Sequence, residues 1–430
     1  MKKILIKNGH IIDPLNQRDE TGDLCIAGGT ILSIADTAGF HPDLVIDAAE
    51  QIVCPGFIDL SVCLREPGHT QKGTIASETR AAAAAGVTSL CLPPDTRPCI
   101  DTPAVVELIK DRADKAGYPR IHPIGALTQR LAGTELSGMF ALKQSGCIAV
   151  SNANQPLANL LILRRAMEYA SSHNLLLIYR ANEFSLSAGG CAHEGAFASR
   201  YGLPGIPEAA ESIALAQCLE LAELTGCRVH INQISCKHSV IKIQQAKKYG
   251  ANVSADVAIH QLHLTEEDMT PFDSAYHVLP PFRGEIDRKY LRDALANGTV
   301  DAISSAHQPH DLDAKLGAFP DTEPGVAALE TLLPLLLNLT RQQVLTLPQA
   351  IASLTQKPAK ILGLPVGHLS PGAPADVCVF DPQASWTVDN ENWLSAGKNT
   401  PYWGQTLTGR VTHTLQNGSL IFRLAAAENS

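Results

Sequence analysis

Hydrophobic and polar positions alternate in a regular way through the middle of this 430-residue chain. Between about residues 57 and 362, short apolar or β-branched runs alternate with longer stretches that repeat with a helical period. The short runs predict eight strands, at 57–62, 87–92, 120–125, 147–151, 175–179, 227–234, 250–255 and 300–305. Eight alternating strand and helix units predict an α/β fold of the TIM (β/α)8 barrel type, whose active sites lie at the C-terminal ends of the strands.

The longer stretches carry their apolar residues on one helical face. We expect helices over 157–172 and 207–225, the second of which opens at Pro207 and closes at Gly226. An open doubly wound sheet is the alternative arrangement. It would need a glycine-rich phosphate loop after its first strand, and the run 60–63 (LSVC) contains no glycine, so a barrel is the prediction.

The two ends of the chain follow a different pattern. Residues 1–54 and 364–430 carry short apolar runs broken by turn pairs such as Asn8-Gly9 and Asn417-Gly418, without long helical stretches between them. We therefore expect these ends to form one small composite β domain beside a barrel at 55–363.

Charge and cysteine content exclude several classes of protein. There are 34 Lys and Arg against 43 Asp and Glu, a formal charge of −9, and without a dense basic run we expect no nucleic acid partner. The N-terminus reaches Lys7 after three apolar residues, so neither a signal peptide nor a membrane span is predicted. Eleven scattered cysteines, an odd number with no Cys-x-x-Cys pair, favour reduced thiols and a cytoplasmic location.

The run 55–68 (PGFIDLSVCLREPG) spans the first predicted strand and the residues directly after it. It resembles the first-strand motif of the dihydroorotases, a family of the amidohydrolase superfamily of metal-dependent TIM-barrel hydrolases. Further matches occur in the family's order, at 185–190 (SLSAGG), 205–207 (GIP), 280–283 (PPFR), 302–303, 307–310 (HQPH) and 371–376 (PGAPAD). The resemblance implies a metal site with His-x-His on strand one, an aspartate after strand four and histidines on strands five and six. It also implies a catalytic aspartate on strand eight.

At each of these positions the chain departs from the pattern that the resemblance implies. The two strand-one histidines, the aspartate region after strand four, the two later histidines and the catalytic aspartate are all replaced. The substituted positions are Ser61, Cys63, Asn152, Ala153, Arg180, Gln233 and Ala306.

These substitutions remove the chemistry of a hydrolytic zinc site. Such a site needs about three imidazole or carboxylate ligands, and of the residues present only Cys63 could bind strongly. At about 4 Å the Arg180 guanidinium would repel a divalent cation by roughly 8 kcal/mol at an effective dielectric near 20. Ala306 cannot act as a general base. We therefore expect no bound metal, no cofactor and no catalytic residue.

The groups that would bind a substrate are partly replaced as well. Asp95, Arg97 and Leu279 stand where the resemblance implies asparagines, whereas Arg65, which it implies grips a substrate carboxylate, remains. Two interpretations of Arg65 stay open. It binds a small anion together with Arg180, or it forms a structural ion pair with a neighbouring carboxylate.

The remaining polar residues of the motifs are expected to be structural. We interpret His307, His310, His230 and His260 as hydrogen-bonded histidines packed into the barrel, and Cys63 as a small buried apolar residue.

Three functions follow from these observations. The first is a catalytically inactive, non-catalytic dihydroorotase-like chain that assembles with the catalytic chain of aspartate carbamoyltransferase in a hetero-oligomer of pyrimidine biosynthesis, a role that only the resemblance implies. The second is an active amidohydrolase that holds one metal through Cys63, His307, His310 or Asp59. The third is a sensor that binds an anionic pyrimidine precursor through Arg65 and Arg180. The first is the prediction, because the strand and helix patterns agree with one another throughout the barrel.

Overall fold

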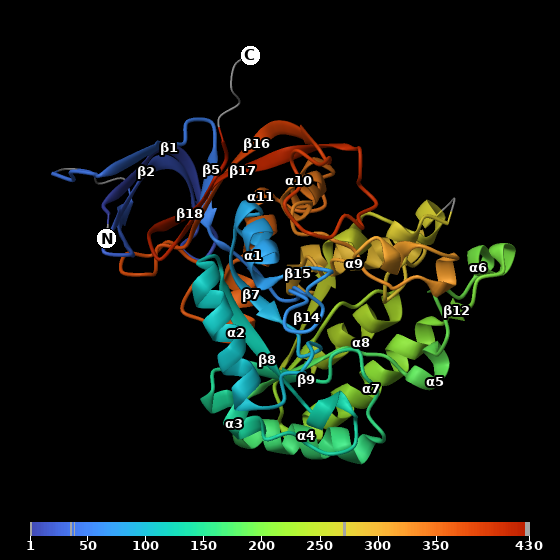
Figure 1. Cartoon of the computed structure of the whole chain (residues 1–430). Helices are drawn as coiled ribbons and strands as arrows, with labels where there is room; N and C mark the ends of the chain where they lie inside the picture. Colours follow the sequence, from blue (N-terminus) through green and yellow to red (C-terminus); the bar gives the residue numbers. More distant parts are fainter. Residues whose placement is uncertain (1, 35–36, 38, 270–271, 426–430) are drawn as a thin grey trace.

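The computed structural model describes residues 2–34, 37, 39–269 and 272–425 (Figure 1). The extreme ends of the predicted β domain, residue 1 and residues 426–430, lie outside the described residues. Within this part of the chain, no helix has both the length and the apolar character that crossing a membrane requires. All eleven cysteines are free thiols.

Eight parallel strands form a nearly closed barrel, which confirms the predicted fold class. They are β6 (Phe57–Asp59), β7 (Val87–Leu92), β8 (Arg120–Ala126), β9 (Ala149–Ser151), β10 (Leu176–Tyr179), β13 (Val229–Ile231), β14 (Val253–Ala258) and β15 (Ala302–Ser304). Each strand pairs with the next along the chain, and each of the eight predicted runs overlaps an observed strand, although β8 runs one residue and β14 three residues beyond the predicted end. The barrel closes just beyond β6 and β15, where Val62 and His307 form an isolated parallel bridge.

Helices follow the strands and surround the barrel (Figure 1). The longer ones are α1 (Ile75–Ala84), α2 (Pro103–Ala116), α3 (Met139–Gln144), α4 (Leu160–Ser172), α7 (Glu208–Thr225), α8 (Lys237–Lys248) and α9 (Glu285–Asn297). They are followed by α10 (Leu332–Arg341), α11 (Leu347–Leu354) and α12 (Gln356–Leu362).

The two predicted helices are present with small changes at their ends. α4 begins three residues later than expected because the Asn159 side chain caps it, accepting a hydrogen bond from the Ile162 N–H at 3.1 Å. α7 ends as predicted, since Gly226 adopts a left-handed conformation with φ 64°.

A long excursion after β10 carries short elements that the hydrophobic pattern does not predict. They are α5 (Phe184–Ser187), β11 (Ala192–His193), α6 (Ala196–Tyr201) and β12 (Gly205–Ile206), and β11 pairs with β12. In Figure 1 this excursion lies at the side of the barrel that is remote from the β domain.

Both ends of the chain contribute to one mixed sheet of eight strands, as predicted. Its strands are β1 (Ile4–Asp13), β2 (Arg18–Ala27), β3 (Thr30–Ile34), β4 (Leu44–Asp47), β5 (Ile52–Pro55), β16 (Val377–Thr387), β17 (Thr406–Gln416) and β18 (Ser419–Arg423). The N-terminal and C-terminal segments meet where β5 pairs antiparallel with β16. The β domain has its own apolar core, which includes Ile6, Leu24, Val53 and Val379.

The β domain packs directly against the barrel. The Thr414 hydroxyl donates a hydrogen bond to the Ala83 carbonyl at 2.7 Å, and Arg120 on β8 donates to the Asp376 carboxylate at 3.0 Å. At Gly86, which has φ 84°, a Cβ would lie 2.5 Å from the Cys378 sulfur. A side chain at this position would therefore push the two units apart.

Candidate functional site

The C-terminal ends of the barrel strands surround a small cavity of about 60 Å³. It is lined by five of the seven substituted positions, which are Ser61, Cys63, Ala153, Arg180 and Gln233. Asn152 and Ala306 do not line it. The Asn152 side chain instead accepts a hydrogen bond from Thr128 at 2.7 Å, which holds it in the loop after β9. The structure therefore brings together most, but not all, of the positions that the sequence singled out.

Gln233 and Ser61, which both line the cavity, are hydrogen-bonded to each other. The Gln233 side-chain amide donates a hydrogen bond to the Ser61 hydroxyl at 3.0 Å, and the Gln233 backbone N–H donates to Asp256 at 3.1 Å. Neutral amide and hydroxyl groups are weak ligands for a zinc ion.

Cys63 is buried, with 3% of its surface exposed. Burial raises the pKa of its thiol to about 12, and Asp95 raises it further while Arg65 and Arg180 oppose the change. Because the thiolate is the form that binds metals and attacks electrophiles, Cys63 is held in its unreactive, protonated form near neutral pH.

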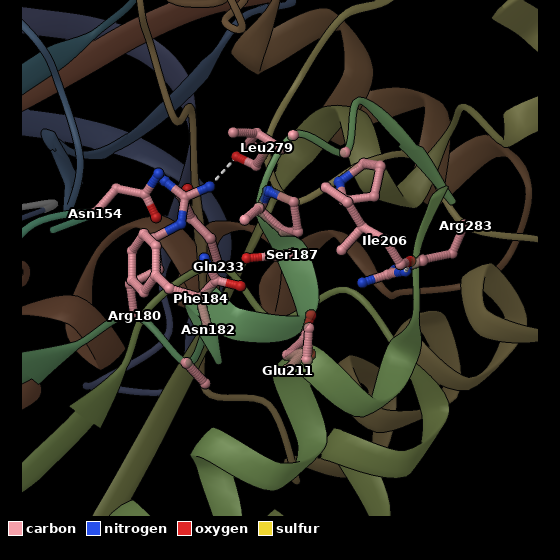
Figure 2. Close-up of a pocket in the computed structure, with 17 residues that line it drawn as sticks. Asn154, Arg180, Asn182, Phe184, Ser187, Ile206, Glu211, Gln233, Leu279 and Arg283 are labelled. Carbon is pink, nitrogen blue, oxygen red and sulfur yellow. Dashed lines mark hydrogen bonds between the residues drawn. The ribbon is translucent and has the colours of Figure 1, made fainter. Parts of the chain in front are cut away.

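Arg180 supplies the positive charge at this site. Its guanidinium donates a hydrogen bond to the Leu279 carbonyl (Figure 2). Burial lowers its pKa to about 10, and the nearby Cys63, Glu211 and Asp95 oppose that change, so it remains charged at neutral pH. No carboxylate oxygen of the described residues lies within 4.0 Å of the guanidinium, so Arg180 forms no ion pair with them.

Three of the substituted positions have an unusual backbone. Ala153, Gln233 and Ala306 adopt left-handed conformations with φ of 49°, 55° and 51°. For residues other than glycine, this conformation costs roughly 1–2 kcal/mol, and it persists where the surrounding fold imposes it, often at functional sites. The surrounding fold thus holds these three positions in a constrained backbone conformation.

Arg65 does not line this cavity. Its Nε donates a hydrogen bond to the Pro309 carbonyl at 2.9 Å, and its Nη2 lies 3.1 Å from His310 Nε2. The interpretation of Arg65 as an ion pair with a carboxylate is wrong, since no carboxylate oxygen of the described chain lies within 4.0 Å of it. The structure does not bring Arg65 and Arg180 into one cavity. The left-handed backbone of Arg65, with φ 62°, turns its side chain toward the loop after β15, which the sequence does not indicate.

His307 and His310 are structural, as expected. His307 Nε2 lies 2.9 Å from Glu78 Oε2, and its Nδ1 accepts a hydrogen bond from the Ala328 N–H at 3.0 Å. His310 Nδ1 lies 3.3 Å from the Lys72 amino group. Each ring nitrogen of these two histidines already has a partner, so neither is free to bind a metal.

The two other barrel histidines differ from each other. His230 is hydrogen-bonded on both sides, to Ser254 at 2.9 Å and to Asp256 at 2.8 Å. For His260 the expectation of a satisfied ring is wrong, because its buried Nδ1 has no partner in the described chain. Burial, with Arg180 nearby, lowers the pKa of His260 to about 4, so the ring is neutral. It packs edge-on against Phe282, which the spacing of the sequence does not show.

Asp59 ends β6, directly before the cavity-lining Leu60 and Ser61, and is completely buried. Its Oδ1 accepts hydrogen bonds from the backbone N–H groups of Ser61 at 3.2 Å and Ser305 at 3.1 Å, whereas its Oδ2 has no partner in the described chain. Burial raises the pKa of this carboxyl to about 6. The sequence indicated Asp59 only as a ligand in the single-metal interpretation.

A second, larger cavity of about 220 Å³ adjoins the first (Figure 2). Both cavities are lined by Asn154, Arg180 and Gln233. The walls of the larger one come mainly from the excursion after β10 and from residues 279–283. Sequence reasoning missed Asn154 as a lining residue because it considered this loop only for metal ligands.

One group of three potential metal ligands occurs among the described residues, away from the substituted positions. Ligand atoms of His193, Glu208 and Asp287 lie within 4.8 Å of one another. Arg283 Nη1 lies 3.0 Å from His193 Nδ1, and Glu208 contacts His238 at 2.5 Å, so cationic or hydrogen-bonded neighbours already occupy this group.

Comparisons with known proteins agree with this architecture. L-hydantoinase (dihydropyrimidinase) from Arthrobacter aurescens has the same fold, with a TM-score of 0.86 and 22% identity over 99% of this chain and 98% of that one. D-hydantoinase from Thermus sp. gives a TM-score of 0.83 and 22% identity over 98% and 97% of the two chains.

Sequence comparisons identify the family. The Dihydro-orotase-like family matches residues 50–239, and an Amidohydrolase family matches residues 338–422. A dihydroorotase-like protein of Pseudomonas aeruginosa is 48% identical over 97% of this chain and 99% of its own length. A dihydroorotase of Syntrophus aciditrophicus is 40% identical over 98% and 99% of the two chains. The chain therefore belongs to the dihydroorotase-like family of the amidohydrolase superfamily.

Proposed function

We propose that this chain is a catalytically inactive dihydroorotase-like protein that serves as a non-catalytic structural subunit of aspartate carbamoyltransferase in pyrimidine biosynthesis. One observation carries the inactive part of the proposal. The cavity at the strand ends is lined by a paired Ser61 and Gln233, a protonated thiol at Cys63 and the cationic Arg180. Asp95 is the one carboxylate among the described lining residues, and no imidazole lines the cavity beside it, so the cavity lacks the set of about three ligands that a hydrolytic divalent ion needs.

The choice of aspartate carbamoyltransferase as the partner rests on the family resemblance. The barrel and β domain form one closely packed unit, with every predicted strand in place, although the positions associated with chemistry are replaced. A maintained fold around a replaced site favours a role in assembly over catalysis. Relatives from two Pseudomonas species carry the name dihydroorotase-like protein, which sets them apart from those named dihydroorotase.

An active single-metal amidohydrolase is the main alternative. It would need ligands from among Cys63, Asp59, His307 and His310. Both histidines have their ring nitrogens engaged, and the Asp59 carboxylate does not line the cavity. Binding a metal would therefore require breaking buried hydrogen bonds, each of which costs about 1–3 kcal/mol when its partner is left unsatisfied.

The test is co-expression with the aspartate carbamoyltransferase catalytic chain of the same cell, followed by size-exclusion chromatography and assay of the transferase. We expect one stable complex in which the transferase is more stable or more active than alone. Binding to the native state alone would add about 2.7 kcal/mol to stability at a hundredfold excess over the dissociation constant. Arg65→Ala and Arg180→Ala variants should co-elute equally well. Separate elution, with a transferase that is fully active alone, contradicts the proposal.

A further inference from the structure

We infer that the barrel centre is a binding site for a small monocarboxylate, whose charged group is held by Arg180. This inference stands apart from the proposed assembly role, because it concerns the cavity and not an outer surface. It also differs from the predicted pairing of Arg65 with Arg180, since Arg65 does not line the cavity.

The first observation is an unpaired positive charge. The Arg180 guanidinium is removed from much of the solvent, yet its one hydrogen bond within the described chain goes to the neutral Leu279 carbonyl. Buried charges are normally paired, because an uncompensated charge away from water is costly. A guanidinium offers two parallel N–H groups that match a carboxylate, so a bound carboxylate would supply the missing partner.

The second observation is the set of polar groups around Arg180. Asn154 lines both cavities together with Arg180, and Asn182 lines the larger one. Figure 2 shows Asn154 beside the guanidinium and Asn182 further along the wall. The side chains of these two asparagines form no hydrogen bond within the part of the chain that the structure describes. They are free to donate to a ligand oxygen or to accept from a ligand N–H group.

The third observation concerns size. By the measure of roughly 10–15 Å³ for one water, the smaller cavity of about 60 Å³ holds about four to six waters. A carboxylate group of three heavy atoms fits that space beside Arg180. The larger cavity of about 220 Å³, with Phe184, Ile206 and Pro281 in its wall, has room for a short and mainly uncharged remainder.

Charges on both sides favour a monoanion. Glu211 lines the larger cavity, where its carboxylate accepts hydrogen bonds from the Ser235 backbone N–H at 3.0 and 3.1 Å. Asp95 lines the smaller cavity. A ligand with a second carboxylate would meet one of these negative groups without a second arginine to offset it. The site therefore selects one negative charge per ligand.

The test uses the full chain and three simple probes at constant ionic strength. Acetate carries the charged group, acetamide has the same shape without charge, and succinate adds a second carboxylate. Binding is followed by the ligand NMR signals and by the melting temperature. We expect saturable binding of one acetate per chain, no saturable binding of acetamide, and at least tenfold weaker binding of succinate.

Variants locate the site. Arg180→Gln should weaken acetate binding at least tenfold, and Arg180→Lys should weaken it less, because it keeps the charge but loses the paired N–H groups. The matched control, Arg65→Gln, should bind acetate like the unmodified chain. If Arg180→Gln fails to fold, Asn154→Leu provides a second test, since it removes the amide that lines both cavities and should also weaken binding.

Several outcomes overturn the inference. They are the absence of saturable acetate binding, equal binding of acetamide, and undiminished acetate binding in folded Arg180→Gln or Asn154→Leu. These outcomes leave the assembly role untouched. Conversely, acetate binding by a chain that never co-elutes with the transferase would contradict the assembly role alone.

Discussion

Two neighbouring regions of the barrel treat their buried polar atoms in opposite ways. At the C-terminal ends of barrel strands, Asp59 Oδ2, Asn232 Oδ1 and His260 Nδ1 have no hydrogen-bond partner within the described residues. By contrast, Glu78 on α1 and His307 after β15 are both fully buried and share one hydrogen bond of 2.9 Å. The Glu78 and His307 side chains are thus hydrogen-bonded to each other, whereas three buried polar atoms at the strand ends, where the family resemblance places chemistry, have no partner among the described residues.

The paired region joins distant parts of the chain. Glu78 on α1 accepts hydrogen bonds from the Ser395 hydroxyl at 2.6 Å and the Ala396 N–H at 3.0 Å, in addition to its contact with His307 beyond β15. We call this cluster the closing network; it consists of Glu78, His307, Ser395 and Ala396. It ties the first helix, the last strand and the segment before β17 together, so its value is structural.

The largest effect should come from breaking the closing network. His307→Ala leaves the buried Glu78 carboxylate without a main partner, and removal of one member of such a buried pair costs about 3–5 kcal/mol. Denaturant unfolding measures this loss. Ser61→Ala in the cavity is the control, with an expected cost of about 1 kcal/mol for its single hydrogen bond to Gln233. Equal losses in the two variants would show that the two regions do not differ.

Asp59 should make stability fall as the pH rises. Its folded pKa of about 6 exceeds the ordinary value of 3.8, so the unfolded chain releases this proton first. Below about pH 4 both states are protonated and no penalty arises. The penalty grows between about pH 4 and 6. It reaches about 3 kcal/mol, since each unit of difference between the folded and unfolded pKa corresponds to about 1.36 kcal/mol.

Asp59→Asn isolates this effect from other titrating groups. The difference in unfolding free energy between the variant and the unmodified chain should shift by about 3 kcal/mol in favour of the variant between pH 4 and pH 7. A difference that stays constant with pH would mean that the buried carboxyl titrates normally.

A smaller effect is expected at Ala306. Glycine there relieves a left-handed strain of roughly 1–2 kcal/mol and adds an entropic cost of roughly 0.5–1 kcal/mol, so Ala306→Gly should stabilise the chain by about 0.5–1 kcal/mol. Ala302→Gly, within the regular strand β15, is the matched control and should destabilise it. Thermal unfolding of the two variants distinguishes them, and a loss of stability in Ala306→Gly would argue against backbone strain.

The smallest effect concerns metal content. We expect no tightly bound transition metal in protein purified without added metal, measured by elemental analysis. Should zinc be present, its origin can be found with two variants. Loss on Cys63→Ser would place it at the barrel centre and contradict this account, whereas loss on His193→Gln alone would place it at the separate group of His193, Glu208 and Asp287.

The sequence predicted the elements of this fold better than the partners of its side chains. Strands and helices follow from local periodicity, and the late start of α4 is a local capping effect of Asn159. The closing network joins Glu78 to His307 and Ser395, which lie 229 and 317 residues further along the chain, and no local pattern reveals such contacts. Arg65 itself has a left-handed backbone conformation, and its side-chain partners follow from that folded loop. Arg180 donates to a carbonyl and forms no ion pair with a described carboxylate, which also depends on the folded surroundings. Such features become visible only when the chain is folded.

The proposed function requires that the barrel centre does not perform hydrolysis. The most direct measurement is the interconversion of dihydroorotate and carbamoyl-aspartate by the purified chain, with and without added zinc, beside a mock preparation. We expect no turnover, and none after Ser61→His with Cys63→His, because Arg180, Gln233 and Ala306 still occupy the other positions and catalytic groups that act as a unit are not restored one at a time. A metal-dependent rate in the unmodified chain, well above the mock preparation, would contradict the account.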